Sequence, residues 1–139
     1  MYKYRVEVTR VVDGDTVDVD IDLGFGMTYK KQRVRMMGID TPESRTRDLE
    51  EKFYGLESKK YLVDLLDGAT VTLVSHDKGK FGRILGELFL GESNLSVNQI
   101  MIENYHAVPY FGQSKDKTEE GHLMNRAALN ELGIIYESK

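Results

Sequence analysis

Apolar and polar residues alternate along the first forty positions of the chain, which is the pattern of half-buried β-strands. Apolar side chains hold even positions over residues 4–8 and odd positions over residues 17–23. The parity changes at Asp13-Gly14, a dipeptide that favours a turn. A third apolar run covers residues 29–39, and Gly38 near its end indicates a bulge or a close approach. The pattern therefore predicts three strands joined by short connections.

The rest of the chain alternates between helical and strand patterns. Apolar residues recur at helical spacing over residues 47–66, and two aliphatic runs at residues 69–74 and 84–90 predict two further strands. Ser96 and Gln99 form a capping box before a short helix, and residues 106–117 look irregular. A last helix is expected to begin at Glu119-Glu120 and to end at Gly133. Its predicted core-facing stripe is Leu123, Met124, Ala127, Ala128 and Leu132.

This order of elements predicts an α+β fold. The expected form is a five-stranded barrel of the oligonucleotide-binding (OB-fold) shape, in which a helix joins the third and fourth strands, with three α-helices in all. The pattern alone does not separate this barrel from other small barrels. With 139 residues and no internal repeat or linker, we interpret residues 1–139 as one domain.

Composition narrows the classes of function. The chain has no Cys, which excludes disulfides, zinc-thiolate sites and thiol nucleophiles. No apolar stretch approaches the roughly 20 residues of a membrane span, so no membrane contact is expected. The net charge is −4. Because binding to nucleic acid by bulk electrostatics needs a basic protein, any contact with phosphate must be local or assisted by a metal ion.

Two groups of acidic residues are candidates for chemistry. Asp15 shares the parity of the apolar side chains of the second strand and should point inward, where a carboxylate needs a partner or a metal ion. Asp40, Thr41 and Glu43 place two carboxylates and a carbonyl at a strand end, a spacing that can hold a hard cation. Taken singly, Asp15 is also explained as a turn aspartate, and Glu43 as an acidic residue at a helix entry.

A second acidic series is not a metal site. Asp18, Asp20, Asp22 and Gly24 faintly match a calcium loop, but the glycine comes one residue late and Tyr29 stands where the loop needs a terminal Glu. We interpret these aspartates as a solvated strand face.

Basic and histidine side chains complete the candidates. Arg33 and Arg35 share one strand face, and Arg83 follows the Gly82 turn, so guanidinium groups from two hairpins can approach one pocket and grip phosphate. Surface salt bridges to nearby aspartates explain each arginine equally well. The three histidines show no metal-ligand spacing and are interpreted as surface or packing residues; they are His76, His106 and His122.

Six pieces of the sequence stand out as possible motifs: Asp13-Gly14-Asp15-Thr16, Arg35, Gly38-Ile39-Asp40-Thr41-Pro42-Glu43, Tyr54-Gly55-Leu56-Glu57, Lys80-Phe81-Gly82-Arg83 and Val97-Asn98. In this order and at this spacing they resemble the micrococcal (staphylococcal) nuclease, or thermonuclease, family. The resemblance covers residues 4–110. It implies an OB-fold barrel with three helices and a calcium-dependent phosphodiesterase acting on DNA and RNA, with single strands preferred and 3′-phosphate ends left.

The resemblance also implies roles for individual residues. Asp15 and Asp40 match calcium ligands, with the Thr41 carbonyl beside them. Glu43 matches the residue that orients or deprotonates the attacking water, and Arg35 and Arg83 match the phosphate clamps. Four residues match substrate contacts, namely Lys80, Phe81, Tyr110 and Phe111. The chain departs from the family at Phe81, where a tyrosine is common, so that a phenolic hydrogen bond to phosphate is lost while stacking is kept.

Two other classes of function stay open from the sequence. One is a catalytically silent OB-fold module that binds nucleic acid or a partner. The other is a structural or inhibitor-like protein whose acidic strand face mimics nucleic acid. For the nuclease interpretation we expect a monomer acting on single-stranded or frayed DNA and RNA. We expect a cytoplasmic protein if Met1 is the native start, although a secreted mature form would look the same.

Overall fold

Five strands close into a barrel in a computed structural model that describes residues 2–78 and 82–138. Around the barrel the order is β1, β2, β3, β6 and β5, and neighbours are antiparallel except β3 and β6, which are parallel. The bounds are Tyr2–Asp13 for β1, Thr16–Gly24 for β2, Met27–Met36 for β3, Val71–Lys78 for β5 and Ile84–Leu90 for β6. The predicted α+β fold with a five-stranded barrel is confirmed.

The barrel interior is filled by the apolar side chains that the alternation singled out. Val17, Val19 and Ile21 of β2 are buried, whereas the aspartates between them are half-buried or exposed. Because side chains alternate along a strand, this register fixes which residues of β2 face inward. Other strands and the helices add further side chains to the same core, among them Val6, Val34, Met36, Leu73, Leu88, Leu62, Leu66, Val97 and Met101.

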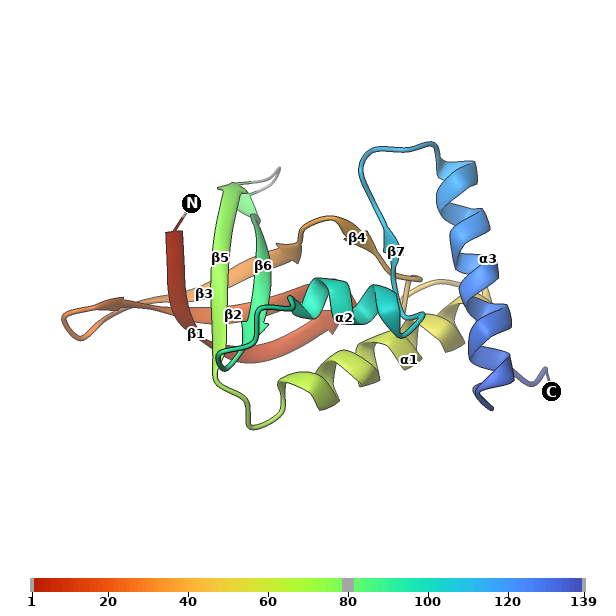
Figure 1. Cartoon of the computed structure of the whole chain (residues 1–139), viewed down its shortest axis with the longest axis horizontal. Coiled ribbons are helices and arrows are strands. Elements are labelled where there is room, and N and C mark those ends of the chain that lie inside the picture. Colours follow the sequence, from red (N-terminus) through yellow and green to blue (C-terminus); the bar gives the residue numbers. More distant parts are fainter. Residues whose placement is uncertain (1, 79–81, 139) are drawn as a thin grey trace.

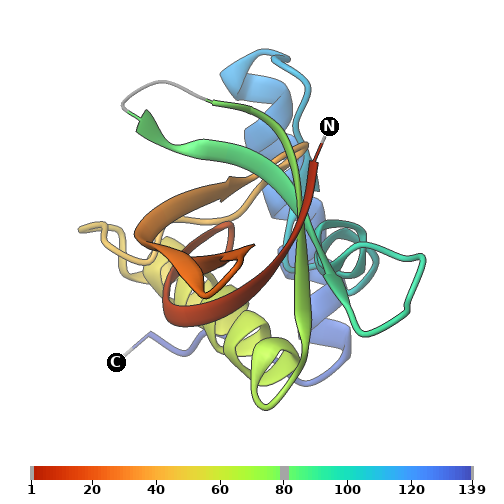
Figure 2. The ribbon, with the colours of Figure 1, turned by 90° about the vertical axis from the view of Figure 1, so that its left-hand side faces the viewer.

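The described residues form three helices: α1 (Leu49–Leu66) packs against β1, α2 (Val97–Glu103) against β6, and α3 (Lys115–Glu131) against a short strand, β7 (Val108–Pro109), outside the barrel. Asp48 caps α1 by accepting from the backbone N–H groups of Glu50 and Glu51, and Ser96 caps α2 by accepting from Gln99. In Figure 1 the β2–β3 hairpin extends to the left and α3 stands at the far right, and Figure 2 shows the helices behind the strands. Within the described residues, no helix is long and apolar enough to cross a membrane.

The predicted third strand is wrong at its end. β3 stops at Met36, and Gly38 adopts a φ of +80°, a left-handed value that turns the chain. Ile39–Asp40 forms a separate strand, β4, which pairs with β7 (Val108–Pro109). Gly38 therefore lies where the chain leaves the barrel strand β3 and begins to pair with β7. A side chain at this position would meet no close neighbour.

Two further boundaries also differ from the prediction. β5 begins at Val71 and continues to Lys78, because its pairing with β6 persists beyond the apolar run through an irregularity between Ser75 and Asp77. The segment 106–117 is not wholly irregular: it contains β7, and Ser114 caps α3, which begins four residues before the expected start. The predicted stop of α3 is confirmed by Gly133, which has a φ of +90°.

The predicted packing face of α3 is wrong. Leu123, Met124 and Leu132 are exposed, and the two buried residues of this helix are His122 and Leu129. Thr118, His122 and Arg126 follow at intervals of four and lie on one side of the helix, toward the cleft described below. A polar stripe thus replaces the expected apolar stripe at the contact with the rest of the molecule.

Candidate active site

A polar cleft of about 620 Å³ lies between the end of the barrel, the segment after β4 and one face of α3. Six of the ten residues singled out from the sequence line it, namely Arg35, Asp40, Thr41, Glu43, Arg83 and Tyr110. Its volume falls in the usual range for ligand sites in proteins, roughly 300 to 1,000 Å³. Residues more than eighty positions apart in the sequence meet in this cleft.

Asp15, in the turn before β2, is buried beside the cleft residues Arg35 and Thr41, and both of its carboxylate oxygens accept hydrogen bonds. Its side chain is 12% exposed, and Oδ1 accepts from the Thr16 hydroxyl at 2.9 Å while Oδ2 accepts from the Thr41 backbone N–H at 3.2 Å. The Met36 N–H donates to the Asp15 carbonyl at 2.8 Å, which extends the β2–β3 ladder and fixes the backbone there. The inward direction expected from parity is confirmed.

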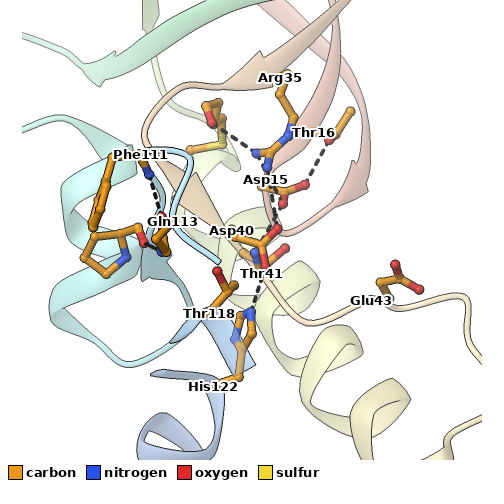
Figure 3. Close-up of polar contacts among 12 residues, drawn as sticks. Asp15, Thr16, Arg35, Asp40, Thr41, Glu43, Phe111, Gln113, Thr118 and His122 are labelled. Atoms are coloured by element: carbon orange, nitrogen blue, oxygen red, sulfur yellow. Dashed lines mark hydrogen bonds and ion pairs between the residues drawn. The ribbon is translucent and has the colours of Figure 1, made fainter. Parts of the chain in front are cut away.

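Arg35 joins the two predicted cation ligands. Its Nη1 lies 3.2 Å from Asp15 Oδ2, and its Nη2 lies 3.6 Å from Asp40 Oδ1. Nη1 also donates to the Met36 carbonyl at 3.1 Å, which holds the side chain against its own strand. The three groups appear together in Figure 3, with Thr41 below them. This charge balance makes a buried aspartate tolerable, since an unpaired carboxylate in this position would be strongly disfavoured.

The donor set around Arg35 suits a hard cation with oxygen ligands. Two carboxylates converge here, one from the turn before β2 and one from β4, and the Thr41 N–H donates to the first of them. Among residues 2–78 and 82–138, no group of three or more His, Cys, Asp or Glu side chains is arranged to hold a metal ion. Any cation here would draw on Asp15, Asp40 and the Thr41 carbonyl, with water at its other positions, as Ca²⁺ and Mg²⁺ both accept.

Glu43 lies apart from this cluster. Its side chain is exposed on the loop after Thr41, and in Figure 3 it points away from Asp15 and Asp40. The loop itself is firmly held, because the Ser44 hydroxyl donates to Asp13 and the Glu43 N–H donates to Glu51 at 3.3 Å. Glu43 therefore belongs to the cleft wall, with its carboxylate outside the cluster.

The other predicted site residues differ in whether they line the cleft. Tyr110 lines the cleft and is 44% exposed, whereas Phe111 is 81% exposed and is not part of the wall. Arg83 lines the cleft. Lys80 and Phe81 lie outside the described residues. The substrate-binding roles of these residues stay predictions.

Arg33 belongs to the outer face of the barrel. Its Nε and Nη2 donate to the two carboxylate oxygens of Asp18 at 2.8 and 3.2 Å. The hydrogen bond from Arg33 lowers the pKa of Asp18 below its ordinary value, and the same bond raises the pKa of Arg33. The surface salt bridge that was one interpretation of each arginine is therefore the correct one for Arg33, and the aspartates around it form the expected solvated face.

Sequence reasoning missed His122. The interpretation of the histidines as packing or surface groups holds for His106, which is buried and stacks on Tyr61 with ring centroids 4.4 Å apart. His122 is buried as well, but its Nε2 lies 2.8 Å from Asp40 Oδ2 in the cleft wall, a contact that the sequence analysis did not predict. The polar positions at four-residue spacing on the last helix, Thr118, His122 and Arg126, were the available signal.

A comparison with protein families shows to which family the chain belongs. The profile described as "Staphylococcal nuclease homologue" matches residues 33–131, which is well over half of the chain. The chain belongs to the staphylococcal nuclease family. The family match begins after Asp15, so that the inward position of this aspartate rests on the structure itself.

Individual members of the staphylococcal nuclease family are similar over much of the chain. The "Micrococcal nuclease" of Shigella flexneri is 30% identical over 122 residues, which cover 81% of this chain and 63% of that protein. The "Thermonuclease" of Staphylococcus hyicus is 35% identical over 88 residues, 62% of this chain and 48% of that protein. An "Uncharacterized endonuclease" of Escherichia coli is 35% identical over 95 residues, 68% of this chain and 54% of that protein. The chain therefore spans about half the length of the curated relatives it matches.

Proposed function

We propose that this member of the staphylococcal nuclease family hydrolyses phosphodiester bonds of DNA and RNA in a calcium-dependent reaction. The observation that carries the proposal is the position of Arg35, which lines a polar cleft and whose guanidinium contacts both Asp15 and Asp40. A guanidinium beside paired carboxylates can hold a phosphate and a divalent cation side by side. The names of the nuclease relatives agree with this chemistry.

Asp15, Asp40 and the Thr41 carbonyl are proposed to hold the cation. When bound, Ca²⁺ supplies positive charge that stabilises the extra negative charge of the phosphoryl transition state. Asp15 is held in place for this task by hydrogen bonds from Thr16 and Thr41, so little reorganisation of its carboxylate is needed. The same contacts keep the cluster intact while no substrate is bound.

Arg35 and Arg83 are proposed to bind the scissile phosphate. Both line the cleft, and planar guanidinium groups bind phosphate oxygens through two parallel N–H donors. The negative charge on the phosphate grows during attack, so donors that are already oriented contribute most in the transition state. Loss of either arginine is expected to lower the rate by about 10²- to 10³-fold.

Glu43 is proposed to act as the general base. It accepts a proton from a water molecule as the oxygen attacks phosphorus and the bond to the 5′ oxygen breaks. The 5′ oxygen takes up a proton from solvent and leaves as the hydroxyl of one fragment, and the other fragment keeps a 3′-phosphate. Because the Glu43 carboxylate points away from Asp15 and Asp40, it must rotate toward the substrate before the reaction. Its backbone is fixed by the Ser44 and Glu51 contacts, so the rotation concerns the side chain alone.

The proposed substrate is a single-stranded or frayed segment of nucleic acid. Tyr110 presents a half-exposed ring at the cleft, where an unpaired base can stack on it. A net charge of −4 disfavours non-specific binding to duplex DNA, so that binding should depend on local contacts.

The orientation of Glu43 also favours a second candidate function. If its carboxylate stays on the outer side of the loop, the barrel would bind nucleic acid without cutting it. Such a catalytically silent binding module would keep the arginine and tyrosine contacts and lose only the general base.

Cleavage of a single-stranded oligonucleotide by the full chain separates the two functions. A nuclease should cleave it with Ca²⁺ and not with excess chelator, with losses of about 10²-fold or more for Arg35→Ala and for Glu43→Gln. Binding of the same oligonucleotide without cleavage under any divalent cation would establish the silent module instead.

A further inference from the structure

His122 of α3 contacts the carboxylate that we propose as a cation ligand. Its Nε2 lies 2.8 Å from Asp40 Oδ2, and the imidazole side chain is only 9% exposed. Figure 3 shows the ring directly below Asp40, on the side opposite Arg35. The two residues are 82 positions apart in the sequence, so the contact depends on the docking of α3.

Both carboxylate oxygens of Asp40 therefore have a partner. Oδ1 faces Nη2 of Arg35 at 3.6 Å, and Oδ2 faces the imidazole at 2.8 Å. The terminal torsion of an aspartate is broad, so a carboxylate with one partner can swing between orientations. Contacts from β3 and α3 together fix the plane of this carboxylate.

Neighbouring contacts place the His122 ring with little freedom. Gly121 packs so closely on β7 that a Cβ atom there would lie 2.9 Å from Val108 Cγ1. Asn125 donates from Nδ2 to the Ala107 carbonyl at 3.0 Å. Because β7 pairs with β4, which ends at Asp40, these contacts tie the helix to the strand that carries the carboxylate.

Packing alone does not explain a histidine at this position. Within the part of the chain that the structure describes, the buried Nδ1 of His122 has no hydrogen-bond partner. A buried polar atom without a partner is unfavourable, and an aliphatic side chain of similar size would avoid this cost. The hydrogen bond to Asp40 is the contact that the imidazole provides and an aliphatic side chain cannot.

We propose that His122 is a positioning residue for the cation site, and that α3 is thereby part of the active site. The inference rests on the proposed function, because it assigns Asp40 to the cation. Groups that hydrogen-bond to metal-binding carboxylates fix their orientation, and their loss commonly weakens metal binding about 10- to 100-fold. His122 does not touch the substrate; it acts through Asp40.

Calcium affinity of the full chain, measured by titration calorimetry, tests the role directly. His122→Leu keeps similar volume and removes the donor, so that affinity should fall about 10- to 100-fold. His122→Gln places an amide N–H at about the reach of Nε2 and should restore most of the affinity, whereas the shorter His122→Asn should not. At saturating Ca²⁺ the cleavage rate of His122→Leu should return to that of the wild type. The variant should differ only in needing a higher calcium concentration to reach this rate.

Leu129→Ala provides the matched control. Leu129 is the other buried residue of α3, and its truncation weakens the docking of the helix while leaving the Asp40 contact in place. It should lower the melting temperature and leave the calcium affinity within about twofold of wild type, since no donor is removed.

Distinct results contradict the inference and the proposed function. Wild-type affinity in His122→Leu, or an equal loss in His122→Gln and His122→Asn, overturns the positioning role while the cation site stands. An equal loss in Leu129→Ala shows that α3 acts only through docking. If His122→Leu does not fold, the calcium affinities of His122→Gln and His122→Asn still test the positioning role. Absence of any calcium binding by the wild type overturns the proposed cation site, and the inference with it.

Discussion

Gly55 of α1 lies directly against the backbone of Glu43. A Cβ atom at position 55 would be 2.3 Å from the Glu43 carbonyl oxygen, far inside van der Waals contact. The loop that carries the proposed general base therefore rests on the helix through a position that has room only for hydrogen. Tyr54, its neighbour, is buried, so the helix cannot simply move away.

Gly55→Ala is expected to impair both stability and activity. Overpacking at such a contact costs about 1 to 3 kcal/mol, and displacement of the Glu43 backbone should lower the rate about 10- to 100-fold. Urea unfolding and oligonucleotide cleavage at saturating Ca²⁺ measure the two effects.

Gly68→Ala is the control for this substitution. Gly68 follows the same helix and has a φ of +67°, and a Cβ atom added there would have no neighbour within 4 Å, so its replacement strains only the local backbone. It should lower stability by about 1 kcal/mol and leave the rate unchanged. Equal rate losses in both variants at equal stability would mean that the Gly55 contact does not position Glu43.

Arg35→Lys is expected to behave like a loss of the side chain. A lysine cannot contact Asp15, Asp40 and the Met36 carbonyl together, because it carries one compact charge in place of a planar fork. Activity should fall about 10²- to 10³-fold, while calcium affinity should change little because lysine and arginine carry the same positive charge. Calorimetry and cleavage rates separate the two quantities.

Arg33→Ala is the matched variant on the same strand. Arg33 is half-exposed and bonded to Asp18 on the outer face, so its loss should leave activity within about twofold and cost at most about 1 kcal/mol of stability. A rate loss in Arg33→Ala as large as that in Arg35→Lys would contradict the assignment of the phosphate clamp to the inner arginine.

His106 makes stability depend on pH. Burial lowers the pKa of its imidazole from 6.5 to about 4, so the folded protein binds fewer protons than the unfolded chain between these values. The free energy of unfolding that depends on the neutral imidazole is fully present above pH 6.5 and is lost progressively as the pH falls toward 4. The loss is up to about 3 kcal/mol for a shift of this size.

His106→Phe isolates this contribution. Phenylalanine keeps the stacking on Tyr61 and has no titrating group, so carboxylates elsewhere affect wild type and variant alike. Urea unfolding at about pH 7 and about pH 4.5 should show that the wild type loses more stability than the variant on acidification. Parallel pH profiles would show that His106 titrates equally in the folded and unfolded chains.

The alternation of apolar residues predicted the barrel and the inward direction of Asp15 because both depend on local side-chain parity. Spacing made Asp40 and Arg35 candidates, and the resemblance to the nuclease family implied their roles. The structure brings the two side chains together. The β4–β7 pair was not predictable in this way, because two-residue strands leave no periodic pattern. The face of α3 was predicted wrongly because this helix packs a polar stripe against the cleft, and His122 meets Asp40 only through that packing.

Hydrolysis in water enriched in ¹⁸O tests the proposed nuclease activity most directly. The wild-type chain is incubated with a single-stranded oligonucleotide and Ca²⁺, and the products are analysed by mass spectrometry. Calcium-dependent attack of water on phosphorus predicts fragments that end in 3′-phosphate and carry one ¹⁸O atom in that phosphate, with no cleavage when the calcium is chelated. Intact oligonucleotide in the presence of Ca²⁺, or products with 5′-phosphate ends, would contradict it.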